Sequence, residues 1–519
     1  MTDIVFMFEV HQPFRVQRRF REKILELIAR GKRPSLNDLR KLYFDEELNR
    51  FVFQRVASRC YLPANETILG EIERFKDRGK KFKVSYSISG VLLEQAEMWY
   101  PEVVESFRKL AKTGLVEFLD QTYYHSLAFL VAEEEFVEQV KEHRRLMKEV
   151  FGYEPRAVEN TEFIYNNYVA KVFERLGYKV MLTEGVERVL GWRSPNYVYK
   201  AKGSDIKLLM RNYKLSDDIG FRFGARWWNE YPLTADKYSA WLASTPGDVI
   251  LIAIDYETFG EHFPAETGIF EFLRWLPGEI LKWEHLNIVT PTEAVERNPV
   301  RDEIDVPEYT AISWADLERD LSAWLHNSMQ WNAFNRLKKL WLAVKAIDRS
   351  GYYDLWRLLS ISDHFYYMST KGGGPGDVHT YFSPYGTALD AYVLYSDVLS
   401  DLESRVYSEL EKNERARLRY AWMRHVPPEN TFIFYRGEGS PTGFMAYNMF
   451  SLIEGVEKVP LESVIFHQRR GDFAKWIEEV VGDTLLSVRI SRIKAIVDSE
   501  DVRSKLLEEF ERRKNELFG

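Results

Sequence analysis

The sequence predicts an α/β protein whose parallel sheet is either open or closed into a barrel. Three observations indicate this fold class. Over roughly residues 1–300, short apolar runs alternate with longer amphipathic segments, which is the β-then-α order of a parallel sheet. Polar side chains follow the ends of several predicted strands, where β/α barrels build their active sites. From about residue 307 onward, long helical patterns replace this alternation.

The predicted strands are short apolar runs bounded by polar segments. Ile4–Val10 is almost wholly apolar, as expected of a buried strand, and the alternate apolar residues of Phe82–Ile88 predict a strand with one face inward. Five further strands are predicted at Leu115–Leu119, Lys179–Leu182, Ile206–Met210, Val249–Ile254 and Asn287–Val289. Helical periodicity in Glu133–Phe151 and Asn166–Leu176 supplies segments that connect them.

The remainder of the chain divides into two parts. Long helices are predicted at Asp316–Ile347, Tyr353–Ser360 and Ala388–Arg424. The glycine-rich Lys371–Gly376 interrupts them and lacks the Gly-Lys-Ser/Thr of a phosphate loop, so we interpret it as a loop beside the site. After a Pro-Pro pair, strands at Thr431–Tyr435 and Val464–His467 and a helix at Asp501–Leu517 predict a small α+β domain. We therefore expect three domains, at residues 1–306, 307–427 and 428–519.

Composition narrows the class of protein. The 519 residues carry 71 Lys and Arg against 79 Asp and Glu, a net charge of −8, which argues against a nucleic-acid-binding protein. One cysteine, Cys60, allows no disulfide within the chain and suits a reducing compartment. Met1–Val10 lacks the basic start of a signal peptide, and no run of about 18 apolar residues predicts a membrane span. We expect a cytoplasmic protein without a membrane or nucleic-acid partner.

The strongest local signal for chemistry is a pair of acids at the end of a predicted strand. Asp255 and Glu257 follow the apolar Val249–Ile254, and alternate residues of a strand share a face. Crowded carboxylates raise one another's pKa, which makes a carboxylic acid useful as a proton donor at neutral pH. The alternative interpretation is a helix cap or a solvated turn. A second acidic segment offers Glu159 and Glu162 among apolar and aromatic neighbours, and the residues alone do not separate these two.

His11 and His125 each follow a predicted strand and form the third element. Neutral imidazoles bind sugar hydroxyls, bind metals, or serve as structural side chains. The sequence has no His-Glu-x-x-His motif or tight Cys/His cluster for a metal, and no Gly-x-Ser-x-Gly nucleophile elbow. Two separated carboxylates among aromatic residues, which make up 15% of the chain, suit the cleavage of glycosidic bonds.

Five motif regions occur in order along residues 1–425. They are His11-Gln12-Pro13, Gly114–Glu117 continuing to His125, Glu162–Tyr165, Asp255–His262, and Ser313–Asp316 with Trp324. Together they resemble glycoside hydrolase family 57, the α-amylase and 4-α-glucanotransferase family. The resemblance implies an incomplete, seven-stranded β/α barrel followed by a helical region that closes over the active site. Residues 428–519 lie outside the resemblance, and their role stays open.

The resemblance also implies roles for the motif residues. Glu162 matches the catalytic nucleophile and Asp255 the general acid/base of a retaining mechanism that uses no metal or other cofactor. Substrate-holding positions are matched by His11, Glu117, His125 and Glu257. Asp363 and His364 lie in Ser362–Tyr367, which resembles a later motif whose Asp reaches back to the sugar. Trp314 is a candidate for stacking on a sugar ring.

We therefore expect a retaining enzyme that cleaves α-1,4-glucosidic bonds of an α-glucan or maltooligosaccharide by α-amylase-type hydrolysis. The same machinery would serve a 4-α-glucanotransferase or a branching enzyme, because the sequence does not separate water from sugar as the acceptor. Two alternatives come from other classes. A metal-dependent carbohydrate hydrolase or deacetylase would place His11, His125 and Asp255 around zinc, and a non-catalytic glucan-binding protein would need no nucleophile.

Overall fold

Parallel strands form the centre of the fold and follow one another around an incomplete barrel. The computed structural model describes residues 1–32, 34–347, 351–371, 383–493 and 500–519. Within these ranges the barrel strands, in their order around it, are β1 (Thr2–Val10), β2 (Val84–Ile88), β3 (Val116–Leu119), β4 (Ala157–Glu159), β5 (Val180–Glu184), β7 (Lys207–Arg211) and β8 (Val249–Asp255). The ladder is weak at two places. An isolated bridge between Asp120 and Val158 joins β3 to β4, and β7 meets β8 at the single pair Arg211 and Leu251. The predicted incomplete, seven-stranded barrel is confirmed.

Three further strands extend the same sheet. β6 (Val198–Ala201) runs antiparallel to β7, β10 (Val300–Ile304) pairs with β6, and β9 (Leu286–Ile288) pairs with the start of β1. The sequence pattern predicts β9 but not β4, β6 or β10. Those three strands are 3, 4 and 5 residues long, which is too short for an alternation of apolar and polar residues to stand out.

Side chains alternate between the interior and the outer face of the barrel, as strand geometry requires. Val5 of β1 and Leu251 of β8 pack in one apolar cluster with residues of β4 and β5 from the other side of the barrel, so they point inward. The intervening residues, such as Phe6, pack in a second cluster with the surrounding helices. The inward series ends at Glu9 and Asp255, which are paired across β1 and β8. Polar side chains therefore meet inside the barrel at the carboxyl ends of the strands.

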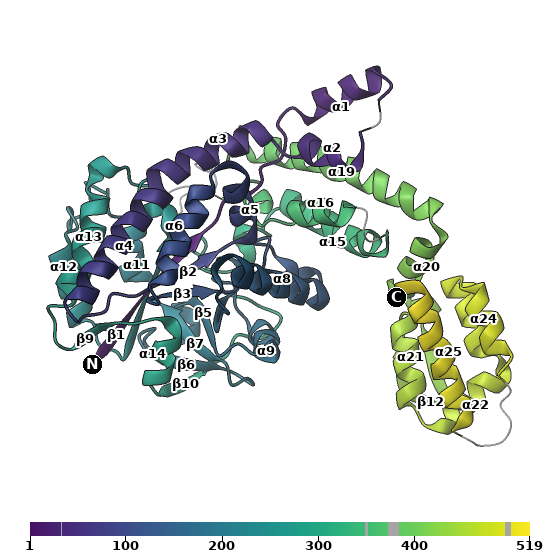
Figure 1. The fold of residues 1–519 in the computed structure, drawn as a ribbon. Helices are drawn as coiled ribbons and strands as arrows, with labels where there is room; N and C mark the ends of the chain where they lie inside the picture. Colours follow the sequence, from purple (N-terminus) through teal and green to yellow (C-terminus); the bar gives the residue numbers. More distant parts are fainter. Residues whose placement is uncertain (33, 348–350, 372–382, 494–499) are drawn as a thin grey trace. The chain divides into compact units, whose positions relative to one another are not determined.

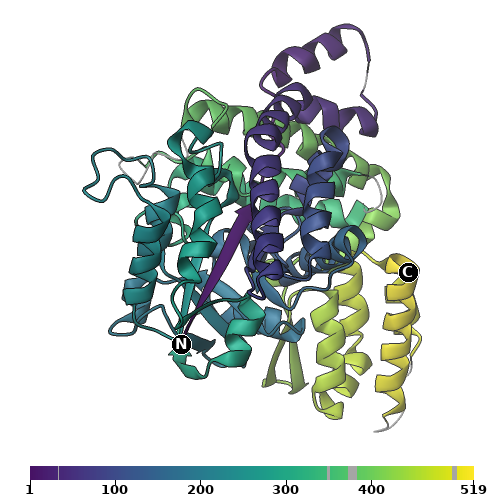
Figure 2. The same cartoon turned by 60° about the vertical axis from the view of Figure 1, so that its left-hand side comes forward.

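Helices cover the outer face of the barrel (Figure 1). Following one another around it are α12 (Ala235–Ser244), α13 (Ile269–Ile280), α4 (Leu62–Asp77), α6 (Pro101–Lys112) and α8 (Glu133–Phe151). In α6, Val103, Phe107 and Leu110 are buried at a spacing of three and four residues, whereas Glu105 and Lys109 are exposed. Figure 2 shows β1, the purple arrow, running from the N terminus into the middle of these helices.

The chain packs as two compact units, residues 1–335 with 357–398 and residues 336–356 with 399–519. The first unit contains the barrel. This division differs from the predicted separate domain at 307–427, because the residues of that range are shared between the two units. The second unit contains a two-stranded hairpin and several helices around an apolar core that includes Phe434, Leu452 and Phe473. Its hairpin and main helices are β11 (Phe432–Gly437), β12 (Ser440–Ala446), α21 (Met449–Lys458), α22 (Leu461–Arg470), α24 (Thr484–Ser491) and α25 (Asp501–Phe518).

One predicted strand is wrong: Val464–His467 lies within the helix α22. A short apolar run reads equally well as a strand or as one turn of a buried helix, and here Val464, His467 and Gln468 are buried at helical spacing. Gly471, with φ of 74°, ends the helix in the left-handed conformation that glycine favours. The partner of β11 is β12, whose Pro441 and Gly443 hide its strand pattern.

Two of the predicted long helices are also shorter than expected. The helix predicted from Asp316 begins only at Ser328, as α15 (Ser328–Ile347), and the residues before it form a loop over the barrel. The predicted Ala388–Arg424 is two helices, α19 (Ala388–Lys412) and α20 (Glu414–Met423). Asn413 separates them because its side chain accepts a hydrogen bond from the amide of Ala416 and so caps the start of α20. Of the predicted loop Lys371–Gly376, residues 372–376 lie outside the described residues. No helix in the described ranges is both long and apolar enough to cross a membrane.

Candidate active site

A cavity opens at the carboxyl ends of the barrel strands, inside the first unit. His11 follows β1, His125 follows β3, and Asp255 ends β8, and all three line this cavity. Glu162 and Asp363 line it as well, although neither lies in a strand. The structure thus brings together side chains from segments that are far apart in the sequence, at the rim where β/α barrels place their active sites.

Glu162 reaches the cavity through an unusual turn of the backbone after β4. Glu162 and Phe163 have φ angles of 59° and 58°, in the left-handed region that residues with side chains avoid. Such a conformation costs about 1–3 kcal/mol per residue and is typical of functional sites. Two hydrogen bonds hold it here: the Trp314 amide donates to the Glu162 carbonyl at 3.2 Å, and the Thr183 hydroxyl donates to the Phe163 carbonyl at 3.0 Å.

The two glutamates that the residues alone do not separate have different surroundings. Glu159 ends β4, is completely buried, and does not line the cavity. The carboxylate of Glu162 lines the cavity and is held on both oxygens, by His125 Nε2 at 3.2 Å from Oε1 and by the indole N–H of Trp314 at Oε2. Of the two, Glu162 is therefore the one in reach of a ligand.

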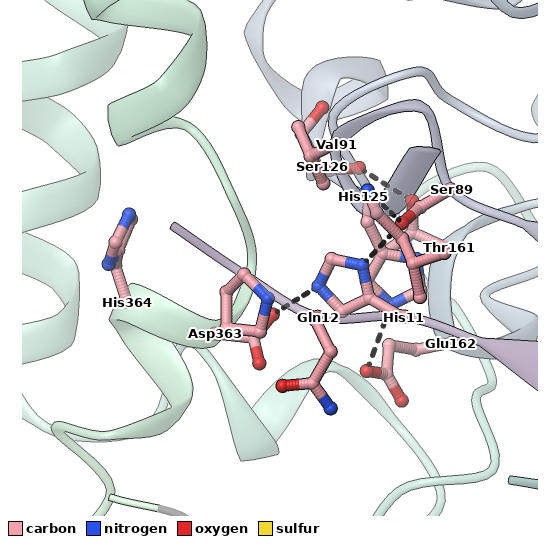
Figure 3. Close-up of polar contacts among 12 residues, drawn as sticks. His11, Gln12, Ser89, Val91, His125, Ser126, Thr161, Glu162, Asp363 and His364 are labelled. Carbon is pink, nitrogen blue, oxygen red and sulfur yellow. Dashed lines mark hydrogen bonds and ion pairs between the residues drawn. The ribbon is translucent and has the colours of Figure 1, made fainter. Parts of the chain in front are cut away.

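His11 and His125 lie face to face, with ring centroids 4.0 Å apart and an angle of 24° between the rings (Figure 3). His11 Nδ1 lies 2.7 Å from the hydroxyl of Ser89, and Nε2 lies 2.9 Å from Asp363 Oδ2. Burial and the neighbouring His125 lower the pKa of His11 to about 4. Burial would also lower the pKa of His125, but the carboxylates of Glu162 and Asp363 outweigh it and raise this pKa.

Asp255 is half-buried and Glu257 is buried, and both acids have raised pKa values. Burial, followed by the negative charge of Glu162, raises the pKa of Asp255 to about 7. Burial and Asp255 raise the pKa of Glu257 to about 8, while the hydroxyl of Tyr61 donates to its Oε1. Both side chains line the cavity. A carboxylic acid that stays protonated near neutral pH can donate its proton to a leaving group.

Asp363 lies in the cavity although it belongs to the helical region, at the start of the short helix α17 (Asp363–Tyr366). The segment before it returns to the barrel: Ile361 forms a bridge with Ser126, and the Ser362 amide donates to the His125 carbonyl at 3.0 Å. Burial would raise the pKa of Asp363, but His11 and His125 outweigh it and lower this pKa. Asp363 is therefore an ionised acceptor facing the cavity.

Glu117 and His364 are predicted site residues that the structure does not bring to the cavity. Glu117 points into the barrel near the amino-terminal end of β3, where it accepts hydrogen bonds from the amide of Thr292, at 3.0 Å, and from its hydroxyl. Glu117 therefore faces the barrel interior, but it lies at the amino-terminal end of the strand, away from the cavity at the carboxyl ends. His364 Nε2 lies 3.0 Å from the Leu358 carbonyl, and the side chain stands apart from the other labelled residues in Figure 3. Successive residues of a helix point in different directions, so Asp363 and His364 do not share the cavity.

Trp314 lines the cavity, and its stacking on a sugar ring stays a prediction. Phe163 stacks on its ring at 4.8 Å, and the guanidinium of Arg211 lies over the ring at 5.5 Å from the centroid. Its indole N–H donates a hydrogen bond to Glu162.

Several polar residues that hold the site together were not predicted from the sequence. Ser89 directly follows β2 and binds His11, and Gln121 lies two positions after β3 and binds His125. Arg211 ends β7 and binds Glu184 of β5 at 2.9 Å, and Arg319 from the loop after Trp314 binds the same Glu184 oxygen at 2.8 Å. Their positions could have indicated them, because each of these residues except Arg319 lies at or just after the carboxyl end of a strand. In the parts of the chain that the structure describes, no three His, Cys, Asp or Glu side chains are grouped as a metal ion would require.

A β/α barrel whose carboxyl-end cavity holds several carboxyl groups and two histidines is the arrangement of an enzyme of the glycoside hydrolase kind. A sequence profile of glycosyl hydrolase family 57 matches residues 5–307. The chain therefore belongs to glycosyl hydrolase family 57, as its motifs predicted.

Two relatives and two solved structures are similar to this chain. The chain is 48% identical over 428 residues to a Methanocaldococcus jannaschii protein named "Putative alpha-amylase", covering 80% of this chain and 88% of the relative. It is 25% identical over 272 residues to an alpha-amylase of Pyrococcus furiosus, covering 50% of this chain and 38% of the relative. A family 57 branching enzyme of Thermococcus kodakaraensis superposes with a TM-score of 0.56 at 15% identity, over 82% of this chain and 92% of that one. A 4-alpha-glucanotransferase of Thermococcus litoralis does so with a TM-score of 0.52 at 16% identity, over 86% and 62%. The two structures support the fold.

Proposed function

We propose that this chain is a retaining α-glucan-active enzyme that hydrolyses α-1,4-glucosidic bonds in the manner of an α-amylase. One observation carries the proposal: Glu162 and Asp255 line one cavity but have different surroundings. His125 and Trp314 hold the Glu162 carboxylate, whereas Asp255 has a pKa of about 7 and can act as an acid. The relative that is 48% identical carries an amylase name, which supports an α-glucan as substrate.

The proposed reaction has two steps. In the first, Glu162 attacks the anomeric carbon and Asp255 gives its proton to the departing glycosidic oxygen, so a glycosyl-enzyme ester forms. Ester formation removes the charge of Glu162, which is the second largest cause of the raised pKa of Asp255. The pKa of Asp255 therefore falls, so Asp255, which has given up its proton, stays ionised and can take a proton from the water that attacks the ester. This mechanism requires the two carboxyl groups to lie about 5–5.5 Å apart.

The acceptor in the second step decides between hydrolysis and transfer. Water gives α-amylase activity, while a sugar hydroxyl gives the 4-α-glucanotransferase or branching activity named for the two structural neighbours. Product analysis on maltooligosaccharides tests the proposal. Products shorter than the substrate support hydrolysis, products longer than the substrate indicate transfer, and no product after long incubation would contradict a glycosidase.

Activity should depend on pH through Asp255. Its pKa is raised to about 7, so the protonated acid that the first step needs is present below this pH and is lost as the pH rises through it. We expect kcat/KM on maltooligosaccharides to fall tenfold for each pH unit well above about 7. A pH–rate profile of the free enzyme measures this. A kcat/KM that stays constant to pH values two units higher would contradict the acid role of Asp255.

Asp363 should act on the substrate despite its position in the helical region. Asp363→Ala should lower kcat by about 10- to 100-fold, because a hydrogen bond to a charged group contributes about 1.5–3 kcal/mol and 1.36 kcal/mol is tenfold in rate. Bonds from sugar hydroxyls that strengthen in the transition state affect kcat more than KM. The matched control is Asp354→Ala, which removes an exposed acid of the neighbouring helix. A normal kcat in Asp363→Ala would exclude this role.

A further inference from the structure

The two stacked imidazoles are bound in the same pattern, with one ring nitrogen on a neutral side chain and the other on a carboxylate. For His11 these partners are Ser89 and Asp363, as described above. For His125, Nδ1 lies 2.8 Å from Gln121 Oε1 and Nε2 lies 3.2 Å from Glu162 Oε1. Figure 3 shows the two rings together with Asp363 and Glu162, and both of these carboxyl groups line the cavity. A neutral partner that can only accept therefore fixes a hydrogen on the ring nitrogen that faces it.

The two neutral partners are not equivalent. The hydroxyl of Ser89 can donate or accept a hydrogen bond, so it can bind His11 Nδ1 whether or not this nitrogen carries a hydrogen. The amide of Gln121 is oriented by its own contacts: Nε2 lies 3.0 Å from Glu9 Oε1 and 2.7 Å from Ser87 Oγ, so it donates there. Its Oε1 then faces His125 and can only accept. His125 Nδ1 must carry a hydrogen.

With Nδ1–H directed to Gln121, the state of Nε2 decides the charge of His125. Nε2 faces a carboxylate, so the ring is held best when Nε2 also donates and His125 is positive. The charged and titratable groups that face this ring from the surrounding elements are Glu9, Glu159, Glu162, Asp255, Asp363 and His11. Five of these are acids, and the sixth, His11, has a pKa of about 4 and is neutral. The positive charge of the stacked pair therefore resides on His125.

We propose that Gln121 is a positioning residue of this active site, which holds His125 so that its Nε2–H points at Glu162. The inference rests on the proposed function, in which Glu162 is the nucleophile. Gln121 is completely buried and does not line the cavity, so it acts through His125 and touches no substrate. The imidazole donor on Oε1 and the indole donor on Oε2 keep the Glu162 carboxylate in one orientation for attack. The same donors stabilise this carboxylate when water displaces it from the sugar.

Two substitutions of one residue test the proposal. Gln121→Met keeps the length of the side chain but removes the acceptor for Nδ1–H, and Gln121→Glu keeps an acceptor oxygen. We expect Gln121→Met to lower kcat about 10- to 100-fold with KM changed less than about threefold, and Gln121→Glu to keep more of the kcat. The pKa of His125, followed by NMR of histidine-labelled protein and assigned with a His125→Gln variant, should fall in Gln121→Met and should not fall in Gln121→Glu.

A matched control separates positioning from a loss of stability. Gln468→Met makes the same change at a buried glutamine of the second unit, whose amide donates to the carbonyls of Ile490 and Ile493 at 2.8 Å each. It should lower the midpoint of thermal unfolding and leave kcat at the wild-type value. A wild-type kcat in Gln121→Met overturns the proposal. Equal losses in Gln121→Met and Gln121→Glu without a change in the His125 titration overturn it as well, because they indicate a purely structural role.

The failure of this inference and the failure of the proposed function give different results. If Glu162→Gln is inactive while Gln121→Met has normal kcat, the nucleophile stands and only the positioning role is excluded. If Glu162→Gln retains activity, the proposed function fails whatever Gln121→Met does. In the event that Gln121→Met does not fold, the His125 titration and kcat of Gln121→Glu still decide, because a lowered pKa in that variant excludes the role.

Discussion

Glu162→Gln should abolish turnover of maltooligosaccharides while the fold survives. The amide has the shape of the carboxylate but cannot attack the anomeric carbon, so we expect kcat/KM to fall by at least about 10⁴-fold, as when a catalytic nucleophile is removed. Steady-state kinetics measure the loss, and circular dichroism with a thermal unfolding curve establishes that the variant is folded.

The matched control is Glu159→Gln, three positions earlier in the chain. Glu159 is buried at the end of β4 and does not line the cavity, so this variant should retain substantial activity. The pair of variants decides between the two glutamates of the same segment. An inactive Glu159→Gln beside an active Glu162→Gln would show that the nucleophile is assigned to the wrong residue.

Asp255→Asn should have the second largest effect, and its size should depend on the leaving group. We expect a loss of about 10²- to 10⁴-fold on maltooligosaccharides, the usual contribution of general acid–base catalysis. The loss in the first step should be smaller on a maltosyl fluoride, because a good leaving group needs little help from an acid. The glycosyl-enzyme would then accumulate, since no base activates water in the second step.

Added azide should rescue this second step, because azide attacks the ester without a general base. The product should be a glycosyl azide with the configuration of the substrate, detectable by mass spectrometry and NMR. Asp248→Asn provides the control, since Asp248 directly precedes β8 and lies at the other end of the strand from Asp255. Equal losses on both substrates, with no effect of azide, would contradict the acid/base role.

The fold is largely predictable because local periodicity reports strands and helices directly. The helix Glu133–Phe151 has the predicted bounds, and the predicted strand Val249–Ile254 differs from β8 by one residue. Errors occur where the pattern is short. The four residues Val464–His467 are as compatible with a helix as with a strand, and their neighbours in space decide for the helix α22.

Long-range contacts in the site are harder to predict. His11 and Asp363 are 352 positions apart, yet they share a hydrogen bond of 2.9 Å. The motif around Asp363 suggests that it reaches the sugar, but no local pattern says which residue it would meet. Gln121 has no motif of its own, and its importance is visible only from the four groups that its buried amide connects, namely Glu9, Ser87, His125 and, through His125, Glu162.

By itself the sequence determined the β/α order, the acids at the strand ends and the family, because these depend on local patterns and on the order of motifs. Only the tertiary structure decided how deep each side chain lies in the barrel. Depth depends on strand register, which pairing with the neighbouring strands sets, so Glu117 lies inside the barrel but away from the cavity. The choice of Glu162 over Glu159 as the residue in the cavity likewise depends on a left-handed turn that contacts with Trp314 and Thr183 hold in place. No periodicity reports such a turn, because its stabilising partners come from elsewhere in the chain.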